Sequence, residues 1–210
     1  MEGLPRLAQL AAARQQARQS DSPLPSGVDP QGHVPGLRVV YGGHDPIFIQ
    51  TPNALLASAI EGRKPGKALD FGMGQGRNTV FLAMQGWDVT GIDPSDEGVR
   101  LAQANAAKAG VKIRALVAID DQFDFGVAQW DLIVMTYIRS MTARDAERIR
   151  RAPAPGGIFV YENGSDRHNE LLKLFLPLRI LRFEDVDAFP DWNPAEKIRL
   201  ERLVAERPPE

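Results

Sequence analysis

The chain contains no cysteine among its 210 residues. This absence excludes disulfide bonds, cysteine-ligated zinc, iron–sulfur clusters and a thiol nucleophile. No charge sign dominates either, since 25 Lys and Arg stand against 27 Asp and Glu. The sequence therefore gives no basic excess that would indicate a nucleic-acid backbone or an anionic membrane surface as a partner.

Long apolar segments are also missing, because no run approaches the roughly 20 residues of a membrane span. The first residues, MEGLPRLAQL, lack a basic stretch followed by a continuous apolar one, so we read no signal peptide and expect a cytoplasmic protein. Prolines and glycines crowd residues 20–37, which is linker composition. We therefore expect a partly helical arm over residues 1–36 and one domain over residues 37–210.

The most informative stretch is residues 68–94, ALDFGMGQGRNTVFLAMQGWDVTGIDP. An apolar strand pattern leads to Asp70, a glycine-rich turn and a helical pattern, and a second strand then ends at Asp93. Such a βαβ unit binds nucleotides, because glycines let a ligand lie against bare backbone and the helix start offers free N–H groups. An acidic residue at the end of the second strand, here Asp93, can accept both hydroxyls of a ribose.

The spacing Asp-x-Gly-x-Gly-x-Gly resembles motif I of the class I S-adenosylmethionine-dependent methyltransferases. The resemblance implies that Asp70 helps to hold the ammonium group of this cofactor and that the glycines lie under its methionine part. A dinucleotide fingerprint would instead need a glycine at Arg77. The residues that we assign to the cofactor in these two turns are Asp70, Gly72, Met73, Gly74, Gly76, Asp93 and Pro94.

The same resemblance implies a Rossmann-like, doubly wound α/β fold. It predicts a mostly parallel seven-stranded sheet with helices on both faces and an antiparallel last strand. A third strand is expected over residues 111–119, and the adenine amino group would contact the acidic residue after it, Asp120, with Asp121 as the alternative. The apolar run over residues 131–137 predicts a central strand whose end, Thr136, opens onto the ligand.

Four residues are candidates for the acceptor side: Tyr41, His44, Tyr137 and His168. An ordinary core or surface position is the alternative for each. We expect residues 155–157, Pro-Gly-Gly, to turn into a fifth strand over 158–161, and residues 162–168 to form a polar loop.

Methyl transfer from a sulfonium needs positioning and exclusion of water, with no metal and no covalent nucleophile. The chain looks closest to small bacterial enzymes of the tellurite-resistance type that methylate small molecules, and it lacks the N-P-P-[YF] motif of amino-methylating enzymes. We therefore expect a small-molecule acceptor. The alternatives are a non-catalytic S-adenosylmethionine-binding protein and a nicotinamide-dependent oxidoreductase.

Overall fold

The computed structural model describes residues 51–118, 123–138, 141–165, 169–192 and 195–209. Five of the candidate residues lie outside these ranges: Tyr41, His44, Asp120, Asp121 and His168. The predicted boundary between residues 36 and 37 also lies outside them, so the two-part division of the chain stays a prediction.

Helices and strands alternate along most of the described chain. The helices are α3 (Ala54–Ile60), α4 (Arg77–Met84), α5 (Asp96–Lys108), α6 (Ala143–Arg151) and α7 (Glu170–Phe175). The strands are β1 (Lys67–Phe71), β2 (Asp88–Asp93), β3 (Arg114–Val117), β4 (Trp130–Thr136), β5 (Pro153–Gly164), β6 (Arg179–Ala188) and β7 (Ile198–Glu206).

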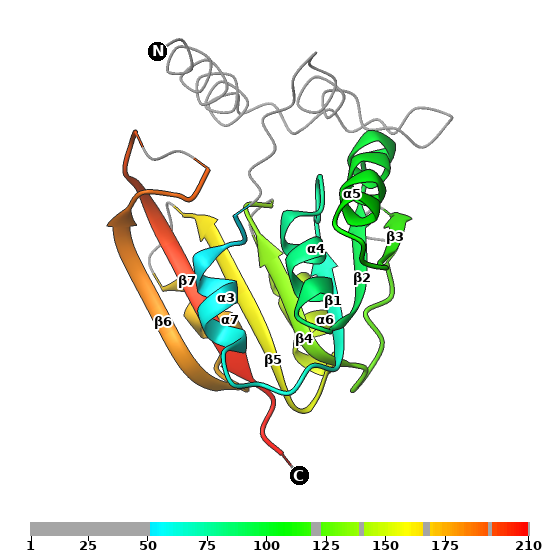
Figure 1. Ribbon diagram of the computed structural model, residues 1–210. Coiled ribbons are helices and arrows are strands. Elements are labelled where there is room, and N and C mark those ends of the chain that lie inside the picture. The colour runs from blue at the N-terminus through cyan, green and yellow to red at the C-terminus, as the bar shows by residue number, and fades with distance from the viewer. Residues whose placement is uncertain (1–50, 119–122, 139–140, 166–168, 193–194, 210) are drawn as a thin grey trace, which may run out of the picture.

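The strands form one seven-stranded sheet in the order β3-β2-β1-β4-β5-β7-β6. Strands β1 to β5 run parallel, whereas β7 inserts antiparallel between β5 and β6. Figure 1 shows α3, α4 and α5 in front of this sheet and α6 and α7 behind it. The predicted fold class, including the antiparallel last strand, is confirmed.

Polar N-caps start three of the helices. The side chains of Asn53, Ser95 and Thr142 accept a backbone N–H from the first turns of α3, α5 and α6. Each cap satisfies one of the N–H groups that a helix start leaves without a partner in the helix. Asn53 is completely buried, so this cap lies in the interior of the fold.

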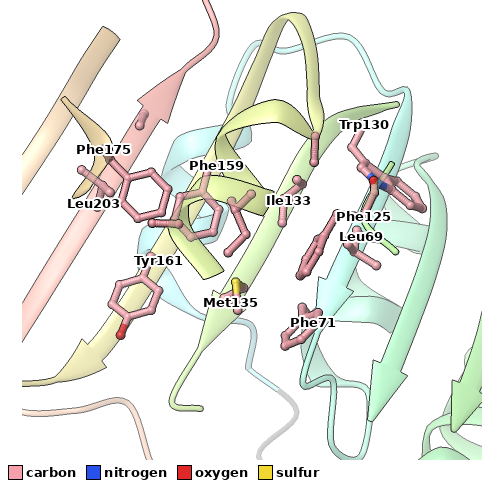
Figure 2. Packing of buried hydrophobic residues seen from close by; sticks show 14 of the residues in the cluster. Leu69, Phe71, Phe125, Trp130, Ile133, Met135, Phe159, Tyr161, Phe175 and Leu203 are labelled. Atoms are coloured by element: carbon pink, nitrogen blue, oxygen red, sulfur yellow. The ribbon is translucent and has the colours of Figure 1, made fainter. Parts of the chain in front are cut away.

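Two apolar clusters cover the faces of the sheet. On the α6 and α7 side, rings and aliphatic side chains such as Phe71, Phe159 and Phe175 pack against Ile133 and Leu203 (Figure 2). The other cluster joins buried side chains of α3 and α4 to the central strands. Because β4 is covered on both faces, its sequence is nearly continuously apolar.

Two strands differ from the predicted bounds. β5 begins at Pro153 and runs to Gly164, so residues 155–157 and Glu162 lie in the strand and not in the expected turn and loop. Antiparallel pairing with β7, in which Glu162 is opposite Arg202, extends the strand beyond its apolar run. β3 is shorter than predicted, because residues 111–113 lie outside its ladder with β2.

Within the described residues, no helix is both long and apolar enough to cross a membrane.

Candidate cofactor and acceptor site

The glycine turn lies at the carboxyl ends of β1 and β2. Gly72, Gly74 and Gly76 have φ angles of 78°, 55° and 82°, which residues with a Cβ rarely adopt. The N–H groups of Gly72 and Met73 both donate to the carbonyl of Ile92, each at 2.9 Å. These two bonds hold the turn against the end of β2.

Gly76 connects the turn to two helices. It is the N-cap of α4, and a Cβ added to it would lie 2.8 Å from Cβ of Ala102 on α5. Glycine at this position therefore allows α4 and α5 to approach each other closely, in addition to providing the positive φ.

Asp70 is enclosed at the end of β1, with 1 % of its surface exposed. Its Oδ2 accepts a 2.6 Å hydrogen bond from the Thr79 hydroxyl on α4. Burial raises the pKa of this carboxyl to about 6, although the Thr79 bond and the charge of Arg77 act in the opposite direction. The described residues thus do not fully compensate the negative charge of this carboxyl, which suits a cationic ligand.

Asp93 already accepts two backbone hydrogen bonds. Its Oδ2 accepts from Gly74 N and its Oδ1 from Ser95 N, both at 2.8 Å. The carboxylate therefore ties the glycine turn to the start of α5. A carboxylate oxygen can accept more than one hydrogen bond, so these two bonds are compatible with the predicted contact to a ribose.

The other predicted cofactor residues take different positions. The Met73 side chain is buried with α5 residues and covers Gly91, so only its backbone belongs to the surface of the turn. Pro94 is half-buried directly after Asp93. Thr136 ends β4, where its hydroxyl accepts a 3.1 Å hydrogen bond from Asn78 Nδ2.

Tyr137 is an unusual residue at the end of β4. Its φ is 54°, in the region that favours glycine, and its hydroxyl donates a short hydrogen bond to Glu162 Oε1. Its ring lies edge-on to Trp192 at 6.1 Å, and the Arg77 guanidinium lies 5.8 Å from the ring centre. Burial, followed by the charges of Asp191 and Glu162, raises the pKa of Tyr137 above its usual range. The phenol is therefore a neutral hydrogen-bond donor and not a base.

Glu162 is the centre of a buried network that our sequence reasoning missed. Its Oε1 also accepts from Asn53 Nδ2 at 2.7 Å, and its Oε2 pairs with Arg202. Asn53 in turn donates its backbone N–H to Asn78 Oδ1 at 2.9 Å. The network joins α3, α4, β4, β5 and β7 at the carboxyl edge of the sheet. A glutamate that directly follows the apolar strand run was the available signal for it.

Three further residues complete this edge. Arg77, the first residue of α4, forms an ion pair with Asp191, which lies between β6 and β7. Ile138 follows Tyr137 and covers Gly72 so closely that a Cβ there would collide with its side chain. In the sequence, Arg77 is notable only because it stands where a dinucleotide fingerprint needs a glycine. No pattern in the sequence identifies Asp191 or Ile138.

Metal ligands do not gather in the described part of the chain, where no group of three or more His, Asp or Glu side chains could hold an ion.

Comparison with known proteins identifies similar sequences and folds. A family model for a methyltransferase domain matches residues 68–157. The ribosomal RNA small subunit methyltransferase C of Alcanivorax borkumensis is 34% identical over 117 residues, which is 50% of this chain and 35% of that protein. The ubiquinone biosynthesis O-methyltransferase of Methylobacterium nodulans is 37% identical over 101 residues, covering 43% of this chain and 38% of that protein. The chain thus spans little more than a third of the length of these two curated relatives.

Among solved structures, TehB from Haemophilus influenzae superposes with a TM-score of 0.65 at 18% identity, covering 72% of this chain and 61% of that one. At this identity the likeness concerns the fold.

Proposed function

Because this chain belongs to the class I superfamily of S-adenosylmethionine-dependent methyltransferases, we propose that it transfers the methyl group of this cofactor to a small-molecule acceptor. Membership of this superfamily supports the reaction class, which is methyl transfer from S-adenosylmethionine. The acceptor is our inference, since the similar proteins include both a ribosomal RNA methyltransferase and a ubiquinone biosynthesis O-methyltransferase.

The buried residues suit the cofactor. Asp70 would hold its ammonium group, because among the described residues this enclosed carboxylate accepts hydrogen bonds from Thr79 alone, and burial disfavours its charge. The glycine turn would support the methionine part with bare backbone, and Asp93 would accept the ribose hydroxyls. Thr136 would border the same ligand, and Asp120, or Asp121 in its place, would contact the adenine.

The cofactor, when bound, supplies a methyl group already activated by a positively charged sulfur. The side chains of this protein would then hold the acceptor in line with that methyl group and exclude water. Tyr137 would act as a wall and a neutral donor, because its raised pKa keeps the phenol protonated. Among the acceptor-side candidates, Tyr41, His44 and His168 remain to be tested by substitution.

The observation that carries the small-molecule proposal is the packing of Trp192 against Tyr137. The connection between β6 and β7 brings this indole to the end of β4, and Asp191 N donates to the Tyr137 hydroxyl at 3.3 Å. An acceptor side bordered by the chain's own aromatic rings suits a small, partly apolar molecule. The net charge of −2 also provides no excess of cations to neutralise RNA phosphates.

The test is transfer of a labelled methyl group. The full chain is incubated with methyl-labelled S-adenosylmethionine and, separately, with a panel of small phenols, amines and thiols, with total RNA, and with a protein extract. We expect label in the small-molecule fraction and loss of transfer in Asp70→Asn. Label found only in RNA or protein would contradict the proposed acceptor class. Cofactor binding without transfer to any fraction would support the non-catalytic alternative.

A further inference from the structure

Arg77 pairs with the carboxylate of Asp191 and acts electrostatically on that of Asp70. Its Nη1 is 2.9 Å from Asp191 Oδ2, and its Nη2 donates to Asp191 Oδ1 at 3.1 Å. Its positive charge also acts on the carboxyl of Asp70, whose pKa it lowers against the larger effect of burial. The Arg77 guanidinium therefore interacts with both the cofactor turn and the connection between β6 and β7.

The pairing with Asp191 leaves a donor of Arg77 unused. Nη1 is buried, and no described residue accepts a hydrogen bond of acceptable geometry from it, despite its short distance to Asp191. A buried donor without an acceptor is unfavourable, so this atom can donate a hydrogen bond to an anionic ligand.

Residues 189–192, here called the closing segment, depend on this ion pair. Asp191 Oδ2 also accepts from Asn53 Nδ2 at 3.1 Å, and Asp191 N donates to the Tyr137 hydroxyl. Asn53 and Tyr137 are neutral, so Arg77 supplies the positive charge that compensates the Asp191 carboxylate in this set. The Asp191 side chain is only 22% exposed, so solvent compensates that charge poorly.

We propose that Arg77 exchanges Asp191 for the carboxylate of the cofactor's amino-acid end, and that this exchange releases the closing segment so that the acceptor enters after the cofactor. The ammonium and carboxylate groups of that end are attached to the same carbon atom. If Asp70 holds the ammonium group, the carboxylate lies beside Arg77. The inference therefore rests on the proposed function.

The consequence is an ordered binding sequence. Without cofactor, Asp191 and Trp192 cover Tyr137 and the acceptor side is closed. With cofactor bound, Asp191 loses its cationic partner and the closing segment gains from moving its charge into water.

Trp192 reports the position of the closing segment. The other two tryptophans, Trp87 and Trp130, are each 5% exposed. Trp87 directly precedes β2 and Trp130 is the first residue of β4, so both lie at the amino ends of these strands, away from the carboxyl edge. We expect S-adenosylmethionine and S-adenosylhomocysteine to shift tryptophan emission of the full-length protein to longer wavelength, and Trp192→Phe to remove this shift. Decarboxylated S-adenosylmethionine keeps the ammonium and sulfonium groups but lacks the carboxylate. It should bind about tenfold more weakly or worse, and without the shift.

Two variants separate this exchange from a general loosening of the hairpin. Asp191→Asn should show the shifted emission before any ligand is added. Asp185→Asn removes the partner of Arg199 elsewhere in the β6–β7 hairpin and should behave as wild type.

The outcomes distinguish the inference from the function on which it rests. If S-adenosylhomocysteine binds by calorimetry but Trp192 emission stays unchanged, or if the decarboxylated cofactor gives the full shift, the exchange is wrong and the proposed function stands. If S-adenosylhomocysteine does not bind to the folded protein, the proposed function itself is wrong.

Discussion

Burial of the ionised Asp70 carboxylate destabilises the ligand-free protein. Its pKa of about 6 in the folded protein exceeds the ordinary 3.8 because the group is completely buried. The folded state therefore holds its proton more strongly than the unfolded chain does. The stability associated with this proton is fully present below about pH 4 and is lost as pH rises through about 6.

We predict that Asp70→Asn stabilises the ligand-free protein. The amide can still accept from Thr79, and no charge needs to be buried. At pH 7 the gain in the free energy of unfolding should be about 2–3 kcal/mol, falling toward zero near pH 4. Urea denaturation at both pH values measures it. A variant less stable than wild type at pH 7 would show that the Asp70 carboxylate is compensated within the chain.

Asp93 has a structural role in addition to the proposed ribose contact. In Asp93→Ala, the N–H groups of Gly74 and Ser95 lose their acceptor. We predict a loss of about 1–3 kcal/mol in the free energy of unfolding without any ligand. Thermal or urea unfolding of the ligand-free variant measures this loss, and unchanged stability would mean that the two N–H groups find other acceptors.

At the scale of elements, the contact between α4 and α5 depends on Gly76. An alanine at this position would have to adopt a positive φ of 82°. Its Cβ would also lie 2.8 Å from the Cβ of Ala102. Gly86, after the other end of α4, is a matched control with a φ of 86° and its nearest atoms 3.8 Å away.

We predict that Gly86→Ala costs about 1–2 kcal/mol through φ alone and that Gly76→Ala costs clearly more. Denaturant midpoints of both variants, measured without ligand, check the difference. Equal costs would show that α5 adjusts to the added methyl group without strain.

The elements themselves were largely predictable where a local pattern exists. The glycine turn, Gly86 and Gly110 mark the ends of strands and helices in the sequence, and the apolar run over residues 131–137 identifies β4. The extension of β5 was not predictable in this way. Glu162 enters the strand because both β4 and β7 pair with it, and Gly164 enters it because β7 pairs with it.

At the scale of the whole molecule, the family resemblance predicts a mostly parallel seven-stranded sheet with an antiparallel last strand, and the observed sheet confirms it. For the network at the carboxyl edge of this sheet, the sequence offers only Glu162 after the apolar run and does not indicate its partners. Asn53 meets Glu162 across 109 positions and Asp191 across 138, so no spacing rule connects them. The Asn53 side chain thereby connects Glu162 in β5 to Asp191 in the closing segment.

The proposed division of the chain leads to a prediction at this scale. If residues 1–36 are a separate arm, a protein beginning at residue 37 should keep the unfolding midpoint of the full chain within about 2–4 °C, since a change of 1 kcal/mol corresponds to that range. Calorimetric scanning of both proteins measures it. A large loss would place part of residues 1–36 in the domain.

The central claim is that the glycine turn and the ionised Asp70 bind S-adenosylmethionine. Calorimetric titration of S-adenosylhomocysteine into wild type and Asp70→Asn, at pH 7.5 and pH 5, tests it most directly. With a pKa of about 6 for Asp70, wild type should bind with micromolar affinity at pH 7.5 and about tenfold more weakly at pH 5. Asp70→Asn should bind weakly at both. No binding by folded wild type at millimolar ligand would contradict the account.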